Sequence, residues 1–231
     1  MTEGAEKTEH HGTGHSARLR KRLLEINGDS LHDHELVEYL LALAIPRRDT
    51  KQIAKDLIAR YGSLSALLTA DAASILQEKW MGETSVAALK IVQVAALRLL
   101  SEPVRELPIL SSWQSLLDYL RADIAHLTIE RVRTLYLNSN NMLIRDEVAS
   151  EGSVDQAAIY TREVIRRAMD LGAAAIILVH NHPSGDSTPS RQDIAMTKDI
   201  ADAGRKFGIA VHDHIIIGKN GYTSMRTAGL I

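Results

Sequence analysis

The chain has 231 residues, of which 45% are hydrophobic and 24% charged, a composition typical of globular proteins with one or two packed cores. It contains no cysteine, so disulfides and thiolate metal sites are excluded, and any metal must be bound through nitrogen and oxygen. The formal net charge of −2 gives no overall attraction to nucleic acid. No apolar run approaches the roughly 20 residues that cross a bilayer, and we expect a cytoplasmic protein without a membrane partner.

The first half of the chain has helical patterns throughout. Apolar residues recur every four positions from Ala87 to Leu99, as on one face of a helix. Before this half lies a polar stretch with histidines at positions 10, 11 and 15, and after it lies a stretch with two prolines and three charges. The predicted organisation is a disordered tail over 1–17, a small all-α domain over 18–101, a linker over 102–110 and a second domain over 111–231.

The second domain alternates between strand and helix patterns. Glycine, proline and asparagine separate the two kinds of segment, with a hairpin turn predicted over 138–141. Strands interleaved with helices predict a sheet covered on both faces, with a functional site at the C-terminal end of a strand. Helices are predicted over 112–120, 161–171 and 190–206, and strands over 131–137, 143–148, 175–180, 209–217 and 222–225.

The most informative stretch is AIILVHNHPSGDSTPSRQD, residues 175–193. Its apolar start predicts a buried strand, and side chains two apart on a strand point to the same side, so His180 and His182 can face one point. Pro183 ends the strand, and a helix that starts at Ser190 can bring Asp193 back to that point. Two imidazoles and one carboxylate with room for water are typical of catalytic zinc sites. The alternative is that Ser190 and Asp193 form only a capping box.

These residues resemble a known signature. The spacing His180-x-His182-Pro183-x(6)-Ser190-x(2)-Asp193 is similar to the metal-binding motif of JAMM (MPN+) metalloproteases. The wider context, HNHPSGDSTPSRQD followed by a helix and DHIIIG, resembles the RadC family (UPF0758 type) over nearly the whole chain. The resemblance implies an α/β fold of the JAMM/MPN-like (cytidine-deaminase-like) kind. In that fold a mixed sheet is flanked by helices, and here a small helix-hairpin-helix-like all-α domain would precede it.

The resemblance also implies the roles of individual residues. His180, His182 and Asp193 would bind one Zn²⁺ per chain, and Ser190 would donate a hydrogen bond to the oxyanion of the tetrahedral intermediate. Glu130, at the head of the first predicted strand, would be the general base. From the residues alone the base stays open among four glutamates, namely Glu130, Glu147, Glu151 and Glu163.

Two further features bear on the site. A second His-x-His, at His212-Asp213-His214, alternates along a strand in the same way. We interpret it as structural, or as a carboxylate that orients an imidazole near the metal. Asn181 stands where the eukaryotic deubiquitinating relatives usually carry serine or threonine, which leaves the ligand set intact and the substrate class open.

The resulting hypothesis is a JAMM-type zinc metallopeptidase that hydrolyses a peptide or isopeptide bond. The alternative is a DNA-associated repair or recombination accessory protein that binds DNA through its N-terminal helices. Arg18–Arg22 supports that alternative, but residues 1–101 carry 13 Lys+Arg against 13 Asp+Glu, and Trp80-Met81-Gly82 keeps only the second glycine of the family's usual Gly-x-Gly. A third hypothesis is a JAMM scaffold that binds partners and has no catalytic activity. The predicted partners are a protein or peptide substrate, DNA, and a second copy of the chain in a homodimer.

Overall fold

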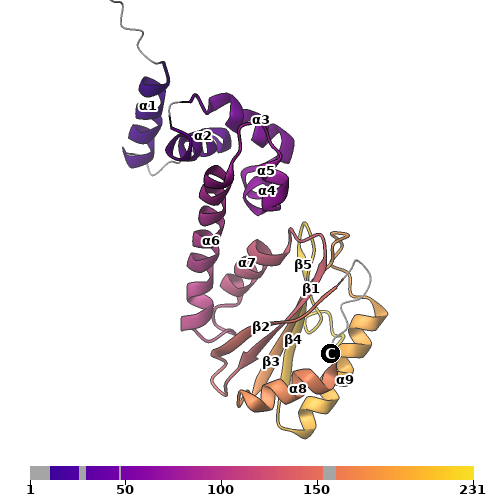
Figure 1. The fold of residues 1–231 in the computed structure, drawn as a ribbon. Coiled ribbons are helices and arrows are strands. Elements are labelled where there is room, and N and C mark those ends of the chain that lie inside the picture. The colour runs from indigo at the N-terminus through magenta and orange to yellow at the C-terminus, as the bar shows by residue number, and fades with distance from the viewer. Residues whose placement is uncertain (1–10, 26–29, 47, 153–159) are drawn as a thin grey trace, which may run out of the picture. The chain divides into compact units, whose positions relative to one another are not determined.

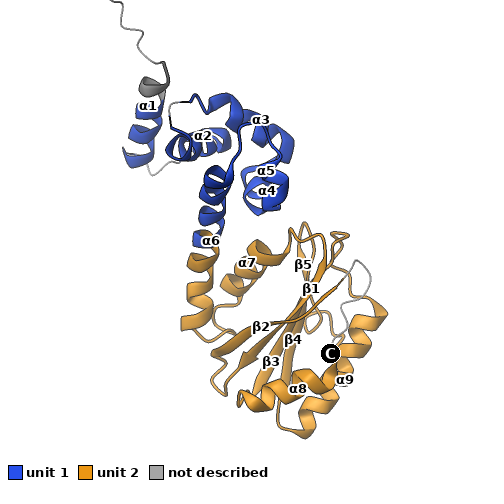
Figure 2. Ribbon diagram, viewed as in Figure 1, with its two compact units in different colours: residues 1–95 blue, residues 96–231 orange. Residues whose placement is uncertain are grey.

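The structure is a computed structural model that describes residues 11–25, 30–46, 48–152 and 160–231. The chain divides into two compact units, residues 1–95 and residues 96–231, and the division falls inside one long helix (Figure 2). The first unit has one apolar core and the second has two, and each unit is described separately below.

The first unit is helical, as the sequence predicts (Figure 1). Its core consists of apolar side chains that recur at helical spacing, among them Val37 and Leu41 on one helix and Ile53 and Leu57 on the next. Its helices are α1 (His11–Glu25), α2 (Asp33–Ala44), α3 (Lys51–Tyr61), α4 (Leu64–Thr69), α5 (Ala72–Leu76) and the first part of α6 (Glu83–Glu106).

Two predicted boundaries in this region are wrong. Helix α1 begins at His11, so the predicted tail over 1–17 is helical in its last part, while residues 1–10 lie outside the described residues. Helix α6 continues through Pro103 to Glu106, where the linker over 102–110 was predicted. The proline removes one N–H from the helix. Val104, one residue later, is buried in the core of the second unit, and this burial outweighs the local helix-breaking signal.

Within the described residues, α6 is the one helix long and apolar enough to cross a membrane by length and composition alone. A single helix of this kind is weak evidence for a membrane span, because helices of globular proteins pass the same test. Lys90, in the apolar stretch, donates hydrogen bonds to the carbonyls of Leu68 and Ala70, which ties α6 to the end of α4. The expected absence of a membrane partner stays a prediction.

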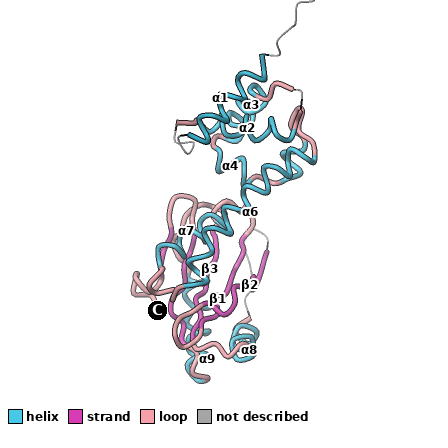
Figure 3. The backbone as a smooth tube through the Cα atoms, turned by 90° about the vertical axis from the view of Figure 1, so that its left-hand side faces the viewer, coloured by secondary structure: helices cyan, strands magenta, loops and turns pink. Residues whose placement is uncertain are grey.

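The second unit is built on one mixed five-stranded sheet with the order β2-β1-β3-β4-β5 (Figures 1 and 3). The hairpin β1–β2 is antiparallel, β1 also pairs antiparallel with β3, β3 runs parallel to β4, and β5 is antiparallel to β4. The strands are β1 (Glu130–Leu137), β2 (Leu143–Gly152), β3 (Ala175–Asn181), β4 (Ala210–Ile217) and β5 (Tyr222–Ser224).

Helices cover both faces of this sheet, because the central strand is apolar on both sides. All seven residues of β3 are buried. Its odd-numbered residues from Ala175 to Val179 pack in a core with α7 (Trp113–Ile124). Ile176 and Leu178 pack in a second core with α8 (Thr161–Asp170) and α9 (Arg191–Lys206). The predicted α/β class, a mixed sheet flanked by helices after an all-α region, is confirmed.

Candidate metal centre

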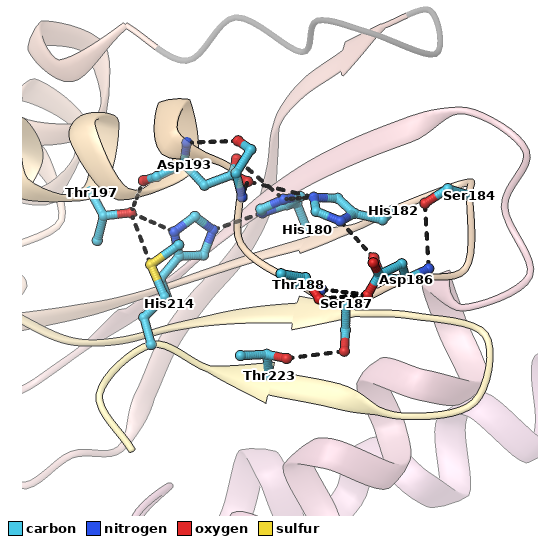
Figure 4. A network of polar contacts seen from close by, with 12 residues as sticks. His180, His182, Ser184, Asp186, Ser187, Thr188, Asp193, Thr197, His214 and Thr223 are labelled. Atoms are coloured by element: carbon cyan, nitrogen blue, oxygen red, sulfur yellow. Dashed lines mark hydrogen bonds and ion pairs between the residues drawn. The ribbon is translucent and has the colours of Figure 1, made fainter. Parts of the chain in front are cut away.

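The candidate site lies where β3 ends and α9 begins. His180 is the second-last residue of β3, and the chain turns at Pro183 and returns through a loop to Ser190. Ser190 is the N-cap of α9: its Oγ accepts the Asp193 N–H at 3.1 Å, and the Asp193 carboxylate accepts the Ser190 N–H at 2.7 Å. The capping box is therefore formed, and it fixes the Asp193 carboxylate at the first turn of α9, facing the histidines (Figure 4).

Three side chains converge at this point. His180 Nε2 lies 2.9 Å from His182 Nε2, and the two nitrogens lie 3.4 and 3.6 Å from the Asp193 carboxylate oxygens. Two nitrogens bound at about 2.0–2.1 Å to a tetrahedral zinc would lie about 3.3 Å apart. The three residues thus form a His-His-Asp cluster that could hold a metal ion, with donor atoms that all lie within 4.8 Å of one another.

The hydrogen bond of His182 fixes its tautomer. Its Nδ1 lies 2.7 Å from the backbone carbonyl of Asp186 in the loop (Figure 4). A carbonyl oxygen only accepts, so Nδ1 carries the proton and donates it. The Nε2 of a neutral His182 therefore presents its lone pair toward His180 and Asp193, as metal coordination requires.

A buried chain of hydrogen bonds fixes the tautomer of His180 in the same way. Thr197 Oγ1 lies 2.6 Å from the Asp193 carbonyl, to which it donates, so it accepts from His214 Nδ1, also at 2.6 Å. Neutral His214 then has only a lone pair at Nε2, which accepts from His180 Nδ1 at 2.8 Å. His180 Nε2 is left with a lone pair toward His182, and either a proton on His182 or a metal ion between the two Nε2 atoms, which lie 2.9 Å apart, satisfies this contact.

The electrostatics agree with neutral His180 and His214. Burial lowers the pKa of His180 to about 4 and places the pKa of His214 well below its ordinary value, so both imidazoles are neutral near pH 7. Burial alone would raise the pKa of Asp193, but its contacts with His182 and Ser190 outweigh this and keep it ionised. The same contact with Asp193 is the largest cause that raises the pKa of His182, and the charge of Glu130 contributes further.

Glu130 starts β1 beside this cluster. Val132 pairs with His180 in the antiparallel ladder, and residues two apart on a strand share a face. Glu130 therefore belongs to the face of the sheet that carries His180, on which α9 packs. The other glutamates that the sequence left open are engaged in ion pairs, Glu147 with Arg167, Glu151 with Arg131 and Glu163 with Arg166.

Comparisons with known proteins bear on this arrangement. A family model described as a RadC-like JAB domain matches residues 110–230. A UPF0758 protein of Rhodobacter capsulatus is 46% identical over 213 residues, which cover 92% of this chain and all of that relative. The chain belongs to the RadC family. The resemblance read from the motif is thereby confirmed, and the JAB match contains the whole sheet and the His-His-Asp cluster.

The second His-x-His of this RadC-like chain is not a second metal site. His212 contacts Asn141 of the β1–β2 turn through Nε2 at 2.6 Å. The buried carboxylate of Asp213 accepts hydrogen bonds from the backbone of His214 and Arg226 and from the Ser224 hydroxyl. Only His214 reaches the cluster.

No motif in the sequence singles out Thr197. Its one signal is the spacing from Asp193, since residues four apart on a helix lie on the same face. Both contacts that give Thr197 its role, to the Asp193 carbonyl and to His214, depend on how α9 lies against β4 in the JAB domain.

We predict that His214→Phe weakens metal binding by the cluster, probed with zinc, about 10–100-fold, because an aromatic ring is kept while His180 Nδ1–H loses its buried acceptor. Thr197→Val, which removes only the hydroxyl, should have a smaller effect of the same sign. Competition with a chromogenic chelator at pH 7.5 measures both affinities. Unchanged affinity in His214→Phe would show that this chain of hydrogen bonds does not orient His180.

Proposed function

We propose that this RadC-like chain is a zinc-dependent metallohydrolase of the JAMM type that cleaves a peptide or isopeptide bond with water. The observation that carries the proposal is the convergence of two imidazole lone pairs and an ionised carboxylate at one point, with both Nδ1 protons committed elsewhere. Two histidines and one aspartate leave an open position in a tetrahedral site, as catalytic zinc sites do. A cytoplasmic location stays part of this proposal.

In this proposal Glu130 and Ser190 each have a separate role in the hydrolysis. When bound, zinc supplies a Lewis acid that lowers the pKa of water at its open position to about 7. The Glu130 carboxylate accepts a proton from the attacking water and returns it to the leaving amine, so that amide and water give a carboxylic acid and an amine. Ser190 Oγ accepts the Asp193 N–H in the cap, which leaves its own hydroxyl proton to donate to the oxyanion.

The test combines metal content with turnover. Full-length protein should contain about one zinc per chain, and peptides cleaved from a proteome-derived library should be found by mass spectrometry. Glu130→Gln should keep the zinc and lose at least about 100-fold in cleavage rate, because only the proton acceptor is removed. Glu163→Gln, on the exposed face of α8, is the matched control and should retain the rate. No zinc after reconstitution, or full turnover in Glu130→Gln, would refute the proposal.

A second candidate function, binding of single-stranded nucleic acid, is favoured by Trp80 in the first unit. Its side chain is 51% exposed, and its backbone has a φ of 70°, in the left-handed region. The guanidinium carbon of Arg48 lies 3.7 Å from the ring centroid, and Lys79 Nζ lies 5.4 Å from it. An exposed indole flanked by cations has the chemistry on which nucleic-acid bases stack.

For this candidate we predict that Trp80→Ala lowers the affinity for a fluorescein-labelled dT20 oligonucleotide about 5–150-fold, the usual loss of one stacked base. Fluorescence anisotropy at two salt concentrations measures it, since phosphate contacts weaken as salt rises. Leu43→Ala, another exposed apolar side chain of the first unit, is the control. Equal affinity of Trp80→Ala and the parent would exclude this surface as the binding site.

A further inference from the structure

Asn181 lies between the two histidines of the cluster, yet the reaction proposed above does not use it. Side chains alternate along a strand, so the Asn181 side chain belongs to the opposite face from His180 and His182. It is only 1% exposed. A buried carboxamide needs partners for both of its N–H donors and for its oxygen.

The carboxamide finds these partners in one short segment before and at the start of β1. Its Oδ1 accepts the backbone N–H of Arg131 at 2.9 Å, and its Nδ2 donates to the carbonyls of Ile129 at 3.0 Å and Leu127 at 3.3 Å. These three contacts span 50 to 54 residues along the chain. One side chain of β3 therefore fixes the backbone that leads from α7 into β1.

The segment held by these three hydrogen bonds, residues 127–131, includes Glu130, which lies between Ile129 and Arg131. The backbone ladder between β1 and β3 ends at the pair Val132–His180. Beyond that pair the side chain of Asn181 takes the place of ladder hydrogen bonds and holds β1 against β3 for two more residues. Glu130 also pairs with Gly152 of β2, on the other side of β1. The position of Glu130 relative to the histidines is thus set from the β3 side by Asn181.

We propose that Asn181 is a positioning residue: by tying the backbone on both sides of Glu130 to the strand that carries His180, it fixes the Glu130 carboxylate beside the metal-ligand cluster. This inference rests on the proposed function for the role of Glu130. Asparagine suits the position because it both donates and accepts. Serine is too short to reach three backbone groups, and aspartate would set a carboxylate against two carbonyls.

The first arm of the test needs no metal. In Asn181→Ala the Arg131 amide loses its acceptor, and its hydrogen exchange, followed by NMR in the full-length protein, should accelerate at least about tenfold. Asn138→Ala is the matched control, because the Asn138 carboxamide also holds the backbone at one end of β1: its Oδ1 accepts two backbone N–H groups in the turn at the other end of that strand. Its exchange effect should stay in that turn. If Asn181→Ala is insoluble, Asn181→Ser serves, with the same expected direction.

The second arm of the test measures metal binding by the His-His-Asp cluster, with cobalt(II) as the probe. The visible absorption of cobalt reports the number and geometry of its ligands, and in the proposed function Glu130 acts on the water that would be among them. We expect Asn181→Ala to bind cobalt with the parent's stoichiometry and to change the spectrum in the same direction as Glu130→Gln. In the Glu130→Gln background, Asn181→Ala should change nothing further. Asn138→Ala should give the parent spectrum.

The outcomes separate the two proposals. A parent that binds neither cobalt nor zinc refutes the proposed function, whatever the exchange data show. Unchanged exchange at Arg131 in Asn181→Ala overturns the inference, whether or not metal binds. A spectral change of equal size with and without Glu130 also overturns it, because Asn181 would then act on the histidines and not through Glu130. Faster exchange together with a spectral effect that depends on Glu130 supports it.

Discussion

His182→Ala will bind zinc at least 100-fold more weakly than the parent, because changes outside the ligand set alone cost about 10–100-fold and this one removes a ligand. The variant leaves His180 Nε2 facing only the Asp193 carboxylate, with a gap in place of the second nitrogen. Titration of full-length protein with zinc in the presence of a competing chelator measures the affinity, and metal analysis after dialysis gives the stoichiometry.

The chain offers a matched control for this variant in His212→Ala. His212 also belongs to a His-x-His on a strand, but it contacts Asn141 and no ligand of the cluster. It should keep the parent's affinity. Both variants should be made in a background in which His10, His11 and His15 are replaced by glutamine, so that weak binding by these histidines does not mask the loss. Equal losses in His182→Ala and His212→Ala would contradict the assigned cluster.

The parts of the site that could be predicted are those set by local geometry. Alternation along a strand is enough to place His180 and His182 on one face, and the capping-box spacing is enough to bring Asp193 to the first turn of the next helix. The same short-range signals located most helices and strands of the second unit to within a few residues. Local patterns alone leave four glutamates as candidates for the general base, and the family resemblance selects Glu130 from them.

The parts that could not be predicted depend on register between distant segments. His214 lies 34 residues from His180 along the chain. Their contact depends on the register in which β4, the strand after α9, pairs with β3. In the sequence, Asn181 differs from the serine or threonine usual at this position of the motif, but this difference indicates no role. The role follows only from its contacts with residues 50 or more positions away. Pro103 is a true local signal against a helix, but it lies inside α6, and the buried side chain of Val104 keeps the helix intact to Glu106.

Arg133→Met is expected to destabilise the second unit by about 3–5 kcal/mol, the usual cost of removing one partner of a buried ion pair. Arg133 is 8% exposed and joins three elements. It forms an ion pair with Asp123 of α7, a two-point contact with Asp146 of β2 at 2.5 and 3.0 Å, and a hydrogen bond to the Tyr119 hydroxyl at 2.9 Å. Burial alone would lower its pKa, but the Asp146 carboxylate and Tyr119 outweigh this, so the guanidinium stays charged.

Urea denaturation followed by fluorescence measures this loss in the second unit alone. The chain has two tryptophans, so Trp80→Phe leaves Trp113 of α7 as the only reporter. Arg166→Met is the matched control, since Arg166 also pairs with two carboxylates, those of Glu163 and Asp170, but its side chain is 63% exposed. That variant should lose less than about 1 kcal/mol.

The charge origin of the Arg133 effect can be separated from lost packing. If unpaired carboxylates cause the instability, adding Asp123→Asn and Asp146→Asn to Arg133→Met should recover at least half of the lost unfolding free energy, because neither half-buried side chain then carries a charge without the guanidinium. A triple variant as unstable as Arg133→Met would assign the loss to the side-chain volume at this junction of α7, β1 and β2.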